Sequence, residues 1–587
     1  MDRIRKYTIY IAAVIIMLVL LPLPVRAAGA WDGKSTEGYE GGDGTEDAPY
    51  EIANAMQLAY MAKMVNAGEP YADTYFILTE DIDLNKKKWT PIGTAMTEFQ
   101  GHVDGEGHSI TGLYIKKKSK AQGLFAYTLN AKLSNITCTM VNIQGKNYVG
   151  TLVGIAAHTT ISGCSVSGEI SGEKYVGGIV GYEANATSDD GTPERLIYGC
   201  VNKARVTASQ YVGGIAGYYK GSIYNSNNYG DLAGVQFIGG IAGYGSANGC
   251  VNHGTIGGVQ DVGGICGYGV PMHAVTACVN LGNIYAGNET GGICGYVSNG
   301  ARITTCSNYG SITGGRCVGG LCGVGSFTQS FNMGQVSGDG YVGGLSGYTI
   351  EGSSDYSYNR GKVKGSKTAT YVGGVVGYMQ PSETGNRLAY CYNTGKISGK
   401  SNIGGITGYN GGTVTDTFYL VNQANIGIGS GNKGTARPRE AADMKSKKQL
   451  ALLNVKETMY QQKSGSYPTL LNAKAASSSN LSTAKKVGKV TEFAGKAGKK
   501  SVTLTWSPLM RVSGYEIYQY DKSKKKYVKK KTLTAVNIGN GTEYFANSYT
   551  VGKLKKNTTY KFRIRAYKEV AGKKYYGKYQ KISVKVK

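Results

Sequence analysis

The octapeptide YVGGIVGY, from Tyr175 to Tyr182, recurs with small changes over most of this chain of 587 residues. Its copies lie 24 to 36 residues apart, counted on the first glycine of each: Gly150, Gly177, Gly213, Gly239, Gly263, Gly291, Gly319, Gly343, Gly373 and Gly404. A period in this range indicates stacked structural repeats, not a single globular core.

A second motif recurs about 13 residues out of step with the first. It begins CVNHGTIGG at Cys250, CVNLGNIYAG at Cys278 and CSNYGSITG at Cys306. Each repeat therefore contains short, β-branched segments separated by Gly, Asn and Ser, which is typical of strands joined by turns. The Leu lattice of leucine-rich repeats and the 3.6-residue period of helical repeats are both missing. We therefore predict an all-β fold, a parallel β-solenoid whose coils stack about 4.8 Å apart.

The glycines of the octapeptide have a geometric explanation. Its Val and Ile can point into a narrow core, while glycines permit turn dihedrals and a close approach of backbone segments. A phosphate-binding loop is the alternative, but no Lys followed by Ser or Thr comes after any copy.

Stacked coils predict columns of like residues, and three columns are visible. One alternates Cys and Ser, which indicates a small inward-facing side chain: Cys138, Cys164, Cys200, Ser226, Cys250, Cys278, Cys306, Ser330, Ser357 and Cys391. Another is made of asparagines, which we expect to hydrogen-bond to their own turns: Asn202, Asn228, Asn252, Asn280, Asn308, Asn332, Asn359 and Asn393. The third contains Cys266, Cys294 and Cys322. Metal or redox roles for these cysteines are the less favoured interpretation.

Taken together, these motifs resemble the GLUG motif repeat of bacterial surface and secreted proteins, which also occurs in streptococcal IgA-cleaving metallopeptidases. The resemblance implies a surface or secreted setting and no defined reaction. We expect an N-terminal cap and first coils over 31–122, GLUG-repeat coils over 123–425, and an exit segment over 426–472. In the cap, Leu58, Met61, Ala62 and Val65 share one helical face.

Residues 1–30 have a basic start, a short apolar run and small residues at the end, as in a secretory signal peptide. An uncleaved membrane anchor is the alternative. We expect no transmembrane segment in the mature chain, because no other stretch is long and apolar enough to span a bilayer. The expected location is extracellular and associated with the cell surface, in a Gram-positive bacterium.

The C-terminal part has a different pattern. A Ser/Ala/Lys linker is expected over 473–486, followed by strands with a period of two over 487–587. This last segment resembles a fibronectin type III domain, a β-sandwich in which Trp506 would be the core tryptophan and Tyr560 the tyrosine corner. From Leu481 onward there are about 27 basic and about 5 acidic residues, so most of the chain's net charge of +27 lies here.

Two sets of residues are candidates for binding. The tyrosine after the third glycine could form a stacked strip that receives sugar rings, or a ladder that only stabilises the stack: Tyr182, Tyr218, Tyr244, Tyr268, Tyr296, Tyr348 and Tyr378. Basic residues interleaved with tyrosine could bind polyanions or be a solvated face: Lys524, Lys525, Lys526, Lys529 and Lys530. The partners expected are polysaccharide, bacterial cell wall, or host extracellular matrix or mucin, with no nucleic acid, no cofactor and a monomeric chain.

We expect no enzymatic activity. The five histidines never form HExxH, GxSxG and P-loop motifs are missing, and the acidic residues Asp231, Asp261, Glu289 and Asp339 fall singly, without a pair in one phase of adjacent coils. Asp189 and Asp190 lie in an insertion after Tyr182, which is one of two insertions at the same phase. The function predicted is an adhesin-like protein. The alternatives are a β-helix polysaccharide lyase or glycoside hydrolase, and a surface scaffold without a ligand.

Overall fold

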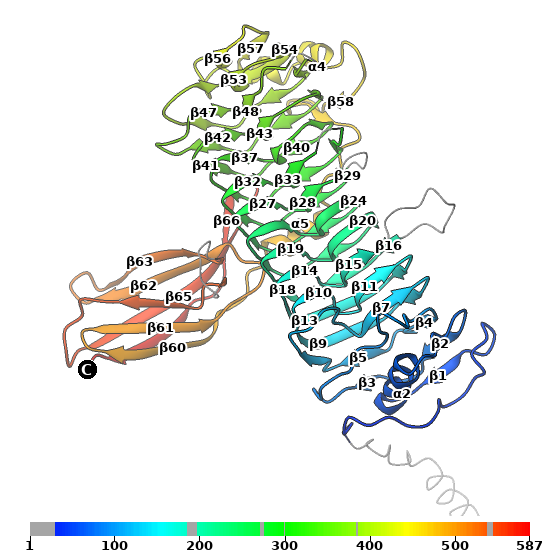
Figure 1. Cartoon of the computed structure of the whole chain (residues 1–587). Helices are drawn as coiled ribbons and strands as arrows, with labels where there is room; N and C mark the ends of the chain where they lie inside the picture. Colours follow the sequence, from blue (N-terminus) through cyan, green and yellow to red (C-terminus); the bar gives the residue numbers. More distant parts are fainter. Residues whose placement is uncertain (1–29, 185–195, 271–274, 299, 383–384, 537–543) are drawn as a thin grey trace, which may run out of the picture.

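A computed structural model describes residues 30–184, 196–270, 275–298, 300–382, 385–536 and 544–587. It confirms the all-β prediction: a long solenoid of parallel strands is followed by an antiparallel β-sandwich that extends sideways from it (Figure 1). The signal peptide predicted for 1–30 lies outside the described residues except for Ala30, and so do Asp189 and Asp190.

The solenoid begins with a helix packed against its first strands. β1 (Tyr50–Ile52) pairs in parallel with β2 (Tyr75–Leu78), and α2 (Ala55–Asn66) lies between them in the sequence. Asn54 caps α2, because its side chain accepts hydrogen bonds from the backbone of Met56 and Gln57. The helical face predicted from Leu58, Met61, Ala62 and Val65 is buried, as expected.

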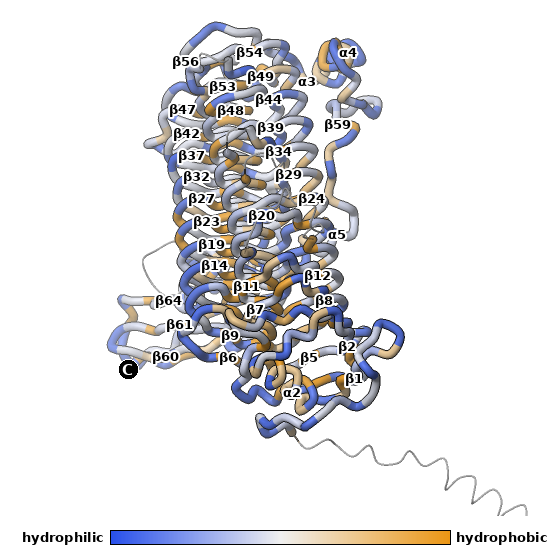
Figure 2. Tube along the Cα trace, turned by 45° about the vertical axis from the view of Figure 1, so that its right-hand side comes forward, coloured by the Kyte–Doolittle hydropathy of each residue, from blue (hydrophilic) through white to orange (hydrophobic). Residues whose placement is uncertain are grey.

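Each coil passes through three parallel sheets. One coil contains β19 (Gln210–Gly213), β20 (Ala216–Tyr224), β21 (Asn227–Asn228) and β22 (Leu232–Ala233). These strands pair in the same order with β23 (Gln236–Gly239), β24 (Ala242–Asn248), β25 (Val251–Asn252) and β26 (Ile256–Gly257) of the next coil. Figure 2 shows the strands of one sheet, β14 (Lys174–Gly177), β19, β23 and those that follow, in a single column.

The paired glycines of the octapeptide lie at the corner between the first two strands of a coil. An ideal Cβ on Gly213 would lie 1.8 Å from the carbonyl oxygen of Ala216, and one on Gly214 would lie 2.1 Å from that of Gly240. Neither glycine has a positive φ, whereas Tyr211 does, at 55°. The close approach of backbone segments therefore explains these glycines, and the left-handed residue of the corner is a tyrosine.

The asparagine column is a buried hydrogen-bond ladder. Each amide binds the backbone of its own turn, as predicted, and each before Asn393 also donates to the next asparagine: Nδ2 of Asn228 donates to Oδ1 of Asn252 at 2.8 Å, and Nδ2 of Asn252 donates to Oδ1 of Asn280 at 2.8 Å. The cysteines are buried, and several donate Sγ–H to backbone carbonyls, as Cys278 does to Thr276 at 3.2 Å.

The chain leaves the solenoid through short helices and then forms the sandwich. The segment expected to be a linker contains α5 (Ser478–Lys485). One sheet of the sandwich contains β60 (Thr491–Gly498), β61 (Ser501–Ser507) and β64 (Ser548–Val551). The other contains β62 (Gly514–Asp521), β63 (Lys526–Thr534), β65 (Thr559–Val570), β66 (Lys573–Tyr576) and β67 (Gln580–Lys585).

The two residues predicted to mark a fibronectin type III domain have the expected positions. Trp506 is buried in the sandwich core. The Oη of Tyr560 accepts a hydrogen bond from the backbone N–H of Lys555 at 2.9 Å, which is the arrangement of a tyrosine corner.

The sandwich is packed directly on the side of the solenoid. Thr255 Oγ1 donates to the carbonyl of Val512 at 2.9 Å, and Tyr285 Oη donates to that of Ser513 at 2.9 Å. Val570 of the sandwich belongs to the same apolar cluster as Tyr309 of the solenoid. These buried contacts hold the two parts in one arrangement.

Candidate functional site

The tyrosines after the third glycine form a stacked column, as the sequence predicted. We call this column the tyrosine strip. Ring centroids are 4.5 Å apart for Tyr218 and Tyr244 and 5.1 Å apart for Tyr268 and Tyr296, with interplanar angles of 5° and 6°. Tyr182 precedes this run, and Tyr348, Tyr378 and Tyr409 form a second stacked run. Val324 pairs with Tyr296 of the preceding coil and with Tyr348 of the following coil, so it occupies the tyrosine position between the two runs.

A second aromatic column lies beside the strip, and the sequence analysis did not identify it. It is made by the first tyrosine of the same octapeptide. Tyr148, Tyr175, Tyr211 and Phe237 stack in order, with centroids 4.6 to 5.2 Å apart. Tyr175 meets Tyr182 edge to face at 5.1 Å. The seven-residue interval between the two tyrosines of YVGGIVGY was the signal that could have revealed this column.

The tyrosine rings are half-buried, so each keeps part of its surface in contact with solvent. Burial raises the pKa of Tyr182, Tyr268 and Tyr296 above the ordinary value of a phenol. These side chains are therefore neutral near pH 7 and can donate and accept hydrogen bonds beside an apolar ring face.

The second column continues into a pair of carboxylates, and here the sequence analysis was wrong. β27 (Gln260–Gly263) pairs with β32 (Asn288–Gly291) so that Gln260 faces Asn288 and Val262 faces Thr290. Asp261 therefore stands opposite Glu289 in adjacent coils. Each lies two residues before the first glycine of its motif, the same position that tyrosine occupies elsewhere, and this column had not been aligned.

The environment of the two carboxyl groups raises both of their pKa values, and Arg316 opposes the shift at Glu289 alone. Asp261 is 5% exposed, and Gln236 Nε2 donates to its Oδ2 at 3.4 Å. Burial raises the pKa of Asp261. Burial and then the charge of Asp261 raise the pKa of Glu289, while Arg316 opposes this shift. The aromatic face thus contains two carboxyl groups with raised pKa values.

The predicted basic residues of the sandwich are exposed, on β63 and the turn before it: Lys524, Lys525, Lys526, Lys529 and Lys530. Lys529 is already paired, since its Nζ lies 2.6 Å from the carboxylate of Glu516. Burial alone would raise the pKa of Glu516, but hydrogen bonds from Lys529, Tyr518 and Arg565 lower it to about 2. Lys529 is therefore less available to an external anion than its neighbours.

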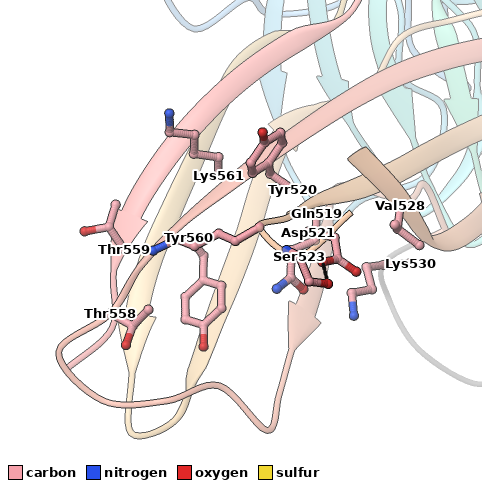
Figure 3. Close-up of a pocket in the computed structure, with 11 residues that line it drawn as sticks. Gln519, Tyr520, Asp521, Ser523, Val528, Lys530, Thr558, Thr559, Tyr560 and Lys561 are labelled. Carbon is pink, nitrogen blue, oxygen red and sulfur yellow. Dashed lines mark hydrogen bonds between the residues drawn. The ribbon is translucent and has the colours of Figure 1, made fainter. Parts of the chain in front are cut away.

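Lys530 lines a cavity of about 400 Å³ in the sandwich, between β62, β63 and the start of β65 (Figure 3). Lys522, Lys561, Tyr520 and Tyr560 also line it. The carboxylate of Asp521 accepts hydrogen bonds from Ser523, so the acid beside these lysines is already partnered. The lining thus combines aromatic rings with three lysines against one carboxylate, a net positive hollow suited to an anionic, partly apolar ligand.

Two further observations concern membranes and metals. Within the described ranges, no helix has the length and apolar character needed to cross a membrane. Among those same residues, His, Cys, Asp and Glu side chains do not gather in groups of three or more that could hold a metal ion.

Comparison with known proteins identifies one domain and two partial relatives. Residues 489–577 match the family model of the fibronectin type III domain. The chain is 32% identical over 165 residues to a protein named a Gly-rich membrane protein from Evansella cellulosilytica, covering 26% of this chain and 18% of that protein. It is 31% identical over 152 residues to halomucin from Haloquadratum walsbyi, covering 24% of this chain and 2% of halomucin. The chain thus spans a small part of the length of each relative.

Proposed function

We propose that this protein is a non-catalytic, adhesin-like protein of the cell surface or extracellular space that binds glycans along its aromatic face. The observation that carries the proposal is the pair of adjoining aromatic columns, in which half-exposed rings repeat from coil to coil. Flat tyrosine faces accept the apolar C–H faces of sugar rings, while phenol groups bind hydroxyls.

The repetition would provide affinity. A pair of aromatic rings gains roughly 0.5–1.5 kcal/mol beyond the area that it buries, and with a gain of that size one sugar on one tyrosine would bind weakly. A polymer that engages several coils gains from each additional contact without paying the full entropic cost of association again. Polysaccharide, bacterial cell wall and host matrix or mucin glycans are the partners that we propose.

The proposed cell-surface or extracellular setting is supported by the names of the two relatives, a Gly-rich membrane protein and halomucin. The exposed lysines of the fibronectin type III domain would add a second, electrostatic contact to acidic wall polymers. Such a contact weakens as salt rises, because exposed charges are screened within about 10 Å at 0.1 M ionic strength.

The strip can be tested with the double variant Tyr218→Ala/Tyr268→Ala. We expect at least a tenfold loss of retention on neutral and acidic polysaccharides and on cell walls, measured by affinity electrophoresis and co-sedimentation. The matched control is Tyr198→Ala, which removes a ring that is 52% exposed outside both aromatic columns. Equal retention of the double variant and the parent would contradict the proposal. Retention of neither on any glycan would favour a scaffold without a ligand.

A second candidate function, glycoside hydrolysis, is favoured by the opposed pair Asp261 and Glu289. Adjacent strands lie about 4.8 Å apart, and carboxyl groups about 5 Å apart are typical of retaining glycosidases. Protonated Asp261 would give its proton to the leaving oxygen while ionised Glu289, beside Arg316, forms the glycosyl ester. Water would then release the sugar and restore the proton to Asp261.

This alternative predicts that soluble fragments are released from a polysaccharide that the parent protein binds. Release should fall at least 100-fold in Asp261→Asn and in Glu289→Gln, with retention on the polymer unchanged, as followed by reducing-end assay. Asp339→Asn serves as a control, because Asp339 is a single acid elsewhere in the solenoid. A parent protein that binds but releases nothing would exclude hydrolysis and leave the adhesin-like function.

A further inference from the structure

A cavity of about 430 Å³ lies at the junction between the solenoid and the fibronectin type III domain. Both parts contribute to its wall: His253 comes from the solenoid, and Arg511 and Lys568 come from the sandwich. Lys486 lines it from the segment that joins them, and Leu509 supplies an apolar surface. This cavity is separate from the tyrosine strip and from the hollow beside Lys530.

The wall of the cavity carries an excess of positive charge. It contains Lys486, Arg511 and Lys568, and no acidic residue lines it among the described residues. Lys568 is 1% exposed, and its Nζ donates to the carbonyl of His253 at 3.2 Å. Burial, opposed by the charge of Asp231 and reinforced by that of Arg511, lowers the pKa of Lys568 to about 8.

The acid at this junction is largely committed to other donors. Both carboxylate oxygens of Asp231 accept from the backbone N–H of Arg511, at 2.9 and 3.1 Å, and Oδ1 also accepts from that of Thr255 at 2.8 Å. Asp231 is fully buried and does not line the cavity. A buried cation is costly unless several partners compensate its charge, so the cavity wall favours an incoming anion.

His253 offers hydrogen-bonding capacity that the protein itself does not use. Its ring is 1% exposed and stacks on Tyr229 with centroids 4.3 Å apart, and neither Nδ1 nor Nε2 has a hydrogen-bond partner among the described residues. Burial, with the charges of Lys568 and Arg511, lowers the pKa of His253 to about 3, so the ring is neutral near pH 7. A neutral imidazole has one N–H donor and one acceptor nitrogen.

We propose that this cavity is a binding site for a single sugar unit bearing an oxyanion, either a carboxylate or a phosphate. Lys568 and Arg511 would neutralise the oxyanion, and His253 would exchange hydrogen bonds with it or with a neighbouring hydroxyl. Leu509 would cover the apolar face of the sugar ring. Because residues of both parts form the site, the ligand would bind only the docked arrangement and would stabilise it.

The test uses the full chain with four probes in titration calorimetry: glucuronate, glucose 1-phosphate, inorganic phosphate and glucose. We expect glucuronate and glucose 1-phosphate to bind, and glucose to bind at least 100-fold more weakly. His253→Phe, which keeps the stacked ring, and Arg511→Gln should each weaken binding at least tenfold. Lys463→Gln, at an exposed position that does not line the cavity, should leave the affinity within twofold of the parent.

A second measurement avoids dependence on the folding of the variants. In the unaltered protein, the ¹⁵N resonances of His253 should shift on addition of glucuronate, because a ring nitrogen gains a partner. Absence of any calorimetric signal at 10 mM glucuronate and glucose 1-phosphate would overturn the site. So would binding that neither His253→Phe nor Arg511→Gln changes, or binding of inorganic phosphate as tight as that of the sugar anions.

The outcome is independent of the proposed glycan binding on the aromatic face. Tyr218→Ala/Tyr268→Ala should keep its affinity for glucuronate, and His253→Phe should keep its retention on neutral polysaccharide. Failure of one site would therefore leave the test of the other intact.

Discussion

Replacement of Gly214 by alanine is expected to unfold the coil that contains it and to lower the stability of the solenoid by more than about 4 kcal/mol, in the exceptional range for one substitution. A Cβ at this position would lie 2.1 Å from the carbonyl oxygen of Gly240 and 2.5 Å from Cγ of Asn228. The first contact is with backbone of the next coil, which cannot move away without breaking the parallel ladder.

The measurement is thermal unfolding by circular dichroism together with limited proteolysis, which should show new cleavage near Gly214. Gly38→Ala is the matched control, since a Cβ on Gly38 meets no atom within 4 Å and its φ is not positive. Unchanged unfolding of Gly214→Ala would contradict the close approach of Gly214 to the Gly240 carbonyl at this corner.

Replacement of Asn252 by leucine is expected to be the second most damaging change and to lower the free energy of unfolding by about 4–6 kcal/mol. It leaves four buried polar groups without their hydrogen bond, at about 1–3 kcal/mol each, and relaxation of the neighbouring backbone recovers part of this loss. Nδ2 of Asn252 donates to Gly254 at 3.1 Å and to Asn280 at 2.8 Å. Its Oδ1 accepts from the backbone N–H of Gly254 at 3.1 Å and from Nδ2 of Asn228 at 2.8 Å. Leucine has a similar volume but can form none of these hydrogen bonds.

Hydrogen exchange is the suitable readout, because coils in a repeat protein can open locally. Exchange of the Gly254 amide and its neighbours should accelerate by two or more orders of magnitude. The exchange rates should change little in Asn248→Ala, at an exposed position of the preceding strand.

A smaller effect is expected in Asn393→Leu, because Asn393 ends the column and makes three such hydrogen bonds in place of four. Equal exchange in Asn252→Leu and the parent would contradict a contribution of the asparagine ladder to the stability of the coil.

The repetitive part of the fold could be predicted from the sequence because each coil repeats the same local requirements. Glycine pairs, inward Val and Ile, and the asparagine column recur at one phase, so aligning them identifies strands, corners and the tyrosine strip. The second aromatic column was missed because it was not aligned, although Tyr175 and Tyr211 hold the same position before their glycines. The same omission concealed the pairing of Asp261 with Glu289.

The docking of the sandwich on the solenoid could not be predicted from recurring residues in the sequence. Its contacts join residues far apart in the chain, such as Arg511 with Asp231 and Lys568 with His253, and each occurs once. A single long-range contact leaves no periodic trace in one sequence. The basic composition of the C-terminal domain was visible, but the burial of Lys568 among its lysines depends on the solenoid surface that covers it.

The interruption of the tyrosine strip at Val324 has a consequence for the length of ligand that the face can distinguish. Tyr296 and Tyr348 are separated by one intervening coil in register, which places them about 10 Å apart along the stack at about 4.8 Å per coil. Under the proposed glycan binding, a short oligosaccharide would occupy one run of rings or the other, whereas a longer polymer would bridge the interruption and occupy both. The face would thereby act as a gauge of chain length, holding long polymers while releasing short fragments.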